Sequence, residues 1–167
     1  DILLHALRFC ADLSWTLSIY GEGEDETMLQ DLAHSLSLSS RVSFFPFSND
    51  ASEMLSEHDV VCVPSRYEGF GIAAVESCAA ARVTVVSGVD GLLEHVDDGV
   101  TGVVVRSSSA ESWAATLRNI MLHRETLSAI AFAGRDMARA EYDVSRMVNG
   151  YMRVYEKVLS RDNIIDI

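Results

Sequence analysis

Residues 60–76 read Val60-Val61-Cys62-Val63-Pro64-Ser65-Arg66-Tyr67-Glu68-Gly69-Phe70-Gly71-Ile72-Ala73-Ala74-Val75-Glu76. The apolar run 60–63 is typical of a buried strand, it breaks at Pro64, and a helix-like run follows Gly71. A strand, a turn and a helix N-terminus therefore meet here. The start of a helix offers unpaired N–H groups and a partial positive charge, which suit an anion. Because Glu68 and Glu76 can accept hydrogen bonds from sugar or ribose hydroxyls, the stretch predicts a nucleotide-sugar as ligand.

On either side of this stretch, short apolar strands alternate with amphipathic helices. We expect strands at 15–20, 41–45, 59–64, 83–87 and 102–105. We expect helices at 2–11, 24–36 and 51–56, from the opening stretch to about residue 81, and from 110 onward with breaks near His123 and Asp143. The segment 88–99 is rich in glycine and aspartate and predicts turns. Since parallel strands need crossover helices, the pattern predicts an α/β fold with a Rossmann-like, doubly wound parallel sheet. Such sheets bind ligands beyond the carboxyl ends of their strands, which is where Glu68 lies.

The composition sets limits on the class of protein. The chain has 167 residues, enough for one domain, and 49% of them are apolar. Its formal net charge is −12. Nucleic acid and anionic membrane surfaces bind clustered cations, so we expect no nucleic-acid partner and membrane association only through regions absent from the chain. An anionic ligand would need local donors.

Cysteine and histidine usage predicts no metal site. Cys10, Cys62 and Cys78 lie in apolar segments without paired spacing, which favours buried free thiols. The five histidines are scattered and form no ligand motif. The sequence contains no membrane-span-length apolar run and opens with no signal peptide, so we expect a reduced, cytoplasmic setting.

The segment 64–71, together with Glu76, resembles the donor-binding signature of retaining glycosyltransferases of the GT-B fold, in the large group that includes bacterial capsule, lipopolysaccharide and mannosyl transferases. The resemblance extends over nearly the whole chain. Residues 21–24 resemble the family's glycine turn, 42–47 its next strand, and 92–102 its late turn and strand. The resemblance implies a single nucleotide-sugar-binding domain over 1–167, the C-terminal half of a GT-B fold. Residues 143–167 would form a C-terminal helix that packs toward an N-terminal domain.

By this resemblance the donor is a nucleoside diphosphate sugar, and a hexosyltransferase type of reaction passes the sugar, with retained configuration, to a glycan or lipid-linked acceptor in polysaccharide biosynthesis. Glu68 is the candidate catalytic residue, which orients the sugar. The amides of Phe70, Gly71 and Ile72 would hold the diphosphate. Glu76 would bind the ribose hydroxyls through charge-assisted hydrogen bonds. The resemblance implies no metal ion and no cofactor.

Four further residues complete the predicted donor site. Gly69 lacks a Cβ, so the backbone can approach the phosphate closely. Gly21 lies in a tight turn that is expected to line the donor cleft. Phe47 and Ser48 follow a strand end where the family holds the nucleobase, so they are candidate base contacts.

The chain also departs from the family pattern. Ala81 and Val83 stand where glycine and proline are usual, and Leu93 replaces the proline before Glu94. A first strand with an arginine and a following lysine, which neutralise the leaving diphosphate, is missing, as is the acceptor domain. We therefore expect a fragment that is inactive alone. The missing strand is central, so we expect the sheet to be completed by something outside the sequence, rearranged, or marginally stable.

Other interpretations remain open. The chain could be a non-catalytic nucleotide-sugar-binding module or a sugar-nucleotide epimerase of the same architecture. The turn 21–23 resembles a dinucleotide motif only weakly, because no third glycine follows. His95 is interpreted as a surface residue, whereas Glu94 is either a surface acid or a residue with a role in the site. An apolar stripe along the last helix is interpreted as core or domain-packing surface; its members are Met147, Tyr151, Val154 and Val158.

Overall fold

The structure is a computed structural model that describes residues 1–160, except the side chain of Thr126. The predicted residues 161–167 of the last helix lie outside the described part. The elements follow one another in this order: α1 (Ile2–Arg8), β1 (Leu17–Tyr20), α2 (Glu26–Ser35), β2 (Val42–Phe45), α3 (Ala51–Ser56), β3 (Val60–Val63), α4 (Ile72–Ala79), β4 (Val83–Ser87), α5 (Asp90–Leu93), β5 (Val103–Val105), α6 (Ala110–Leu122), the 3-10 turn η1 (Arg124–Thr126), α7 (Leu127–Tyr142) and α8 (Val144–Leu159).

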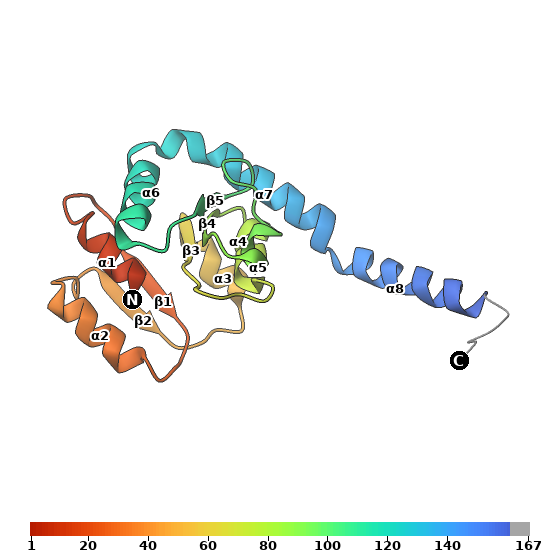
Figure 1. Cartoon of the computed structure of the whole chain (residues 1–167), viewed down its shortest axis with the longest axis horizontal. Coiled ribbons are helices and arrows are strands. Elements are labelled where there is room, and N and C mark those ends of the chain that lie inside the picture. The colour runs from red at the N-terminus through yellow and green to blue at the C-terminus, as the bar shows by residue number, and fades with distance from the viewer. Residues whose placement is uncertain (161–167) are drawn as a thin grey trace.

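The strands are parallel and are connected by helices, which confirms the α/β prediction. β1 pairs with β2, and β3, β4 and β5 form a second sheet in that order. Figure 1 shows the two sheets as separate groups of arrows. Every predicted strand is present, and each predicted helix lies within one or a few residues of its expected bounds. The segment expected to contain only turns differs, because it includes the short helix α5.

The sheet is interrupted between β1 and β3. Within residues 1–160, β1 pairs only with β2, and β3 pairs only with β4. A cavity of about 570 Å³ is lined on one side by Thr16 and Leu17 and on the other by Val60 and Cys62. The expected missing central strand therefore corresponds to a gap between two half-sheets, and a rearranged sheet is excluded.

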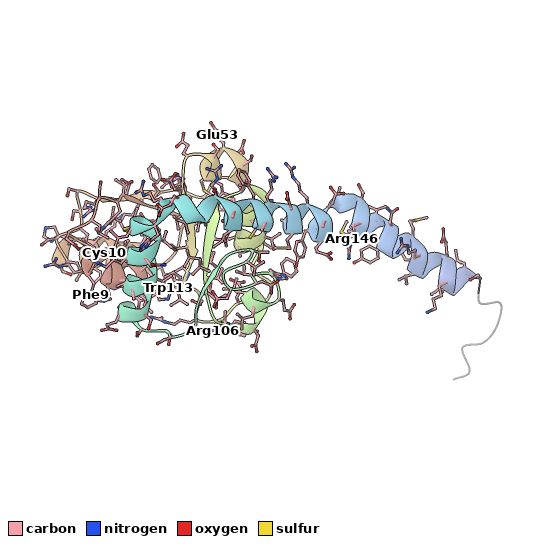
Figure 2. All side chains as sticks on the ribbon, turned by 90° about the horizontal axis from the view of Figure 1, so that it is seen from above. Phe9, Cys10, Glu53, Arg106, Trp113 and Arg146 are labelled. Carbon is pink, nitrogen blue, oxygen red and sulfur yellow. The ribbon has the colours of Figure 1, made fainter. Side chains whose placement is uncertain are left out.

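One helical layer joins the two half-sheets. Helices α1 and α6 pack against each other, and the fully buried Trp113 of α6 lies near Cys10, the two being labelled in Figure 2. The same core cluster includes Val42 of β2 and Val85 of β4. Apolar burial on this face is thus continuous across the gap, which explains how the half-sheets stay together without a shared ladder.

A second, smaller core lies on the other face of β3, β4 and β5. Successive side chains of a strand point to opposite faces, so Val85 enters the first core and Val86 the second. Val86 packs with Ala74 of α4 and Leu92 of α5. This second core fixes α4 and α5 next to each other at the carboxyl end of β3.

Helix α8 extends away from the rest of the molecule (Figures 1 and 2). None of its residues is buried in the structure described. Its predicted apolar stripe is exposed, so the stripe is not part of the core of residues 1–160; these residues are Met147, Tyr151, Val154 and Val158. The prediction that this helix packs toward another domain stays a prediction.

Candidate functional site

The junction between β3 and α4 is built around Gly71. This residue has φ 83° and ψ 48°, a left-handed conformation that favours glycine, and it forms the N-cap of α4. Its carbonyl accepts hydrogen bonds from the N–H groups of Ala74 (2.9 Å) and Val75 (3.2 Å). In the part of the chain described, no side chain caps α4. The N–H groups of Ile72 and Ala73, which precede these hydrogen-bonded positions, therefore remain available to an anion at the carboxyl end of β3.

Helix α5 presses against the loop that precedes α4. A Cβ on Gly91 would come within 2.2 Å of the Glu68 carbonyl oxygen, and a Cβ on Gly71 within 2.5 Å of the Leu92 side chain. Gly69, in contrast, has open space around its Cα. The loop is thus held from one side by α5, while Gly69 leaves the other side accessible. Sequence reasoning missed this role of α5.

The two signature carboxylates lie in different surroundings. Glu68 is half-buried and accepts a hydrogen bond from the Ser65 hydroxyl at 3.2 Å, which restricts its side chain. Glu76 is exposed on the second turn of α4. The structure places both on the strand–loop–helix unit that the sequence predicted. Their roles toward sugar and ribose stay predictions.

A cleft of about 540 Å³ lies at the carboxyl ends of β3, β4 and β5. Ser65, the partner of Glu68, lines it together with Gly88 and two cationic side chains, Arg66 and Arg106. Arg66 forms an ion pair with the exposed carboxylate of Asp1. Arg106, labelled in Figure 2, lies 3.6 Å from an oxygen of Asp98. The two arginines therefore place hydrogen-bond donors and positive charge at this cleft, although the net charge of the chain is strongly negative.

The three predicted residues of the other half-sheet also follow strand ends. Gly21 comes directly after β1, has φ 136°, and donates its N–H to the Phe45 carbonyl at 3.1 Å. Phe47 and Ser48 follow β2, and Phe47 is 68% exposed. All candidate residues thus lie at the carboxyl edges of the two half-sheets. Contact of these three residues with a donor stays a prediction.

His95 was predicted to be a surface residue, and this was wrong. Its side chain is only 6% exposed. It contacts Phe70 of the signature loop and Tyr142, the last residue of α7. The spacing of Leu92, His95 and Val96 follows the i, i+3, i+4 pattern of one helical face, so this signal could have revealed its burial. Glu94, whose role the sequence left open, is exposed.

The three cysteine thiols are poorly disposed to react. Cys10, Cys62 and Cys78 are free, and burial raises the pKa of all three, that of Cys62 to about 12, which disfavours the reactive thiolate. Among residues 1–160, no group of three or more histidine, cysteine, aspartate or glutamate side chains is arranged to hold a metal ion. No helix in the same range is long and apolar enough to cross a membrane.

Comparison with known proteins finds relatives that are named as glycosyltransferases. The sequence profile described as glycosyl transferases group 1 matches residues 1–137. A D-inositol 3-phosphate glycosyltransferase of Geodermatophilus obscurus is 34% identical over 139 residues, which are 81% of this chain and 30% of the relative. The glycosyltransferase YqgM of Bacillus subtilis is 29% identical over 150 residues, which are 89% of this chain and 42% of the relative. The chain thus spans less than half the length of these relatives.

Solved structures share the fold. A glycosyltransferase from Rickettsia africae superposes with a TM-score of 0.88 at 19% identity, over 96% of this chain and 44% of that one. Anabaena HepE, solved in complex with UDP-glucose, gives a TM-score of 0.83 at 22% identity, over 93% of this chain and 44% of that one. The split sheet therefore belongs to a Rossmann-like domain of the kind found in GT-B glycosyltransferases.

Proposed function

Because the chain belongs to the glycosyl transferases group 1 family, we propose that it forms the donor-binding part of an enzyme that transfers a sugar from a nucleoside diphosphate sugar. The observation that carries this proposal is the uncapped N-terminus of α4, which opens beside the restrained carboxylate of Glu68 at the carboxyl end of a parallel strand. Complexes of the related fold in HepE with UDP and UDP-glucose support a nucleotide-sugar as the ligand.

Each predicted residue receives a role in this proposal. The amides of Phe70, Gly71 and Ile72 bind the diphosphate at the N-terminus of α4, and Gly69 and Gly71, which lack a Cβ, let the backbone approach it closely. Glu68 orients the transferred sugar, and Glu76 accepts hydrogen bonds from the ribose hydroxyls. Gly21, Phe47 and Ser48 border the nucleoside. Positioning and stabilisation of the departing diphosphate then supply the rate enhancement.

The finer features of the reaction are also proposals. We propose that transfer retains the anomeric configuration, needs no metal ion, takes place in the cytoplasm, and serves a glycan or lipid-linked acceptor bound by another domain, toward which the apolar face of α8 packs. We propose that residues 1–167 alone do not transfer sugar. In the part of the chain described, the two arginines of the cleft are already engaged by Asp1 and Asp98, which weakens their ability to neutralise a leaving diphosphate.

Calorimetric titration of the natural polypeptide tests the proposal. The ligands are uridine, guanosine and adenosine diphosphates and their glucose or mannose conjugates. Glu76→Gln should weaken binding of the bare diphosphate by about 1 to 3 kcal/mol, since a charged hydrogen-bond acceptor is lost. Glu68→Gln should leave the bare diphosphate unaffected and reduce only the additional affinity of the sugar conjugate.

Glu57→Gln is the matched control, because Glu57 is an exposed acid at the opposite, amino end of β3. It should bind every ligand like the unmodified protein. Equal affinity of the Glu76 variant would remove Glu76 from the site. If the natural polypeptide binds none of these ligands, the proposed function is wrong.

A further inference from the structure

Three aromatic side chains from separate elements meet beneath the signature loop. The Phe70 ring lies 4.3 Å from the His95 ring and 5.9 Å from the Tyr142 ring, measured between centroids. The rings of His95 and Tyr142 are 5.2 Å apart and nearly perpendicular. Phe70 belongs to the loop before α4, His95 follows α5, and Tyr142 ends α7. We call these three residues the aromatic cluster.

A hydrogen bond orients the imidazole within the aromatic cluster. Nδ1 of His95 lies 2.5 Å from the hydroxyl oxygen of Tyr142. Burial, followed by the nearby carboxylates of Glu141 and Glu94, raises the pKa of Tyr142, so the hydroxyl keeps its proton and shares a hydrogen bond with Nδ1. The other ring nitrogen of His95, Nε2, is buried and has no hydrogen-bond partner among residues 1–160.

Packing alone does not account for histidine at this position. A leucine would fill the space without leaving a buried polar atom unpaired, and such an atom carries a cost in free energy. What the imidazole adds over leucine is a directional contact: Tyr142 fixes the plane of its ring, and this ring supports Phe70.

The backbone connects this contact to the anion site. Phe70 immediately precedes Gly71, whose carbonyl accepts the N–H groups of Ala74 and Val75 in the first turn of α4. Since the Phe70 ring is 46% exposed, contacts on its inner side decide its orientation. We propose that His95 and Tyr142 are positioning residues that hold Phe70 and, through it, the N-terminal turn of α4 in the geometry that binds the donor. This inference rests on the proposed function for the identity of the ligand.

Amide hydrogen exchange in the natural polypeptide tests the positioning role without any ligand. Tyr142→Phe removes only the hydroxyl, and His95→Leu removes both ring nitrogens. Both variants should accelerate exchange at Ala74 and Val75 about three- to tenfold, while exchange in α6 stays unchanged. Because the two residues act through one contact, the double variant should exchange no faster than the faster single variant.

Two further variants sharpen the test. His34→Leu removes an imidazole from the exposed surface of α2, outside the aromatic cluster, and should leave exchange at Ala74 and Val75 unchanged. His95→Gln can still accept a hydrogen bond from Tyr142 and should restore part of the protection that His95→Leu loses. Unchanged exchange at Ala74 and Val75 in both single variants would overturn the proposal, and so would acceleration spread evenly over the whole chain.

Titration with UDP separates this inference from the proposed function. Loosening of the α4 turn should raise the UDP dissociation constant by a similar factor of about three to ten, with no change for His34→Leu. Faster exchange without loss of affinity would overturn a role in donor binding. If the natural polypeptide binds no nucleotide, the proposed function fails, and the exchange measurement still decides whether the aromatic cluster positions α4.

Discussion

Two helices are each followed by a residue that has a left-handed backbone conformation but is not glycine. Ser37 follows α2 with φ 60°, and Ala81 follows α4 with φ 55°. After α4, the N–H groups of Ala81 and Arg82 donate to the Cys78 and Ser77 carbonyls at 2.8 and 3.1 Å. This is the Schellman arrangement, in which glycine is preferred because it has no Cβ. The unusual alanine in the sequence therefore stands at a strained position.

Ala81→Gly should stabilise the protein by about 1 kcal/mol, because glycine adopts the left-handed conformation without the Cβ penalty. Chemical denaturation of the variant and the unmodified protein measures the difference in the free energy of unfolding. Ala79→Gly, in the last turn of the same helix, is the control and should destabilise by about 0.5 to 1 kcal/mol. An Ala81→Gly variant no more stable than the unmodified protein would contradict this account.

Single residues differed in how well the sequence predicted them. The start of a helix after Gly71 was predicted correctly, because a run with helical character follows this glycine directly. His95 was interpreted wrongly, because its burial depends on Tyr142, which is 47 residues away in the sequence. Distant partners of this kind leave only a weak local pattern.

At the scale of secondary structure, the periodicity of apolar residues predicted nearly every strand and helix. The strand Val83–Ser87 has its predicted bounds, since four apolar or β-branched residues follow a helix end without interruption. The helix Asp90–Leu93 was missed, because four residues are too few to show a period among glycines and aspartates. This missed helix, α5, packs against the loop that precedes α4 and so supports the candidate site.

Gly91→Ala tests the contact between α5 and the signature loop. The added Cβ would approach backbone atoms of Glu68 to 2.2 Å, so the loop or α5 must shift. We expect a loss of about 1 to 3 kcal/mol in the free energy of unfolding, together with weaker nucleotide binding. Denaturation and calorimetry give the two quantities.

Gly23→Ala is the control for this substitution, since Gly23 has open space around it and no positive φ. Its free energy of unfolding should change by less than about 0.5 kcal/mol. A Gly91 variant that behaves like the Gly23 variant would show that α5 does not restrain the loop.

At the scale of the whole molecule, the parallel direction of the strands was predictable, but the helical packing across the interruption was not. Alternating strands and helices implied one parallel sheet, and the family pattern indicated that a central strand was missing. The packing of α1 and α6 across both half-sheets is a tertiary feature that keeps the cavity open. No local sequence pattern encodes it.

Cys62 offers a probe of this cavity. Burial raises the pKa of its thiol from 9.0 to about 12, so the folded state binds a proton that the unfolded state releases above pH 9. The stabilising contribution is therefore complete below pH 9 and is lost as the pH rises toward 12. We expect the thermal midpoint to fall in this range, and to fall less for Cys62→Ala.

The Cys10→Ala variant serves for comparison, because burial also raises the pKa of Cys10 but this thiol does not line the cavity. Alkylation at pH 8 should be slow for Cys62 in the folded protein, since its raised pKa keeps the thiol protonated at that pH. Rapid alkylation under native conditions would show that solvent enters the cavity freely.

Among residues 1–160, β1 and β3 each have one edge without a strand partner, and these two edges affect aggregation. Each presents a row of backbone donors and acceptors that can template the strand of another polypeptide, so a split sheet is a hazard for aggregation and for exchange of segments between molecules. The net charge of −12 opposes such encounters through mutual repulsion, which salt screens. The solubility of this chain should therefore depend on ionic strength, and high salt should drive association through the open edges.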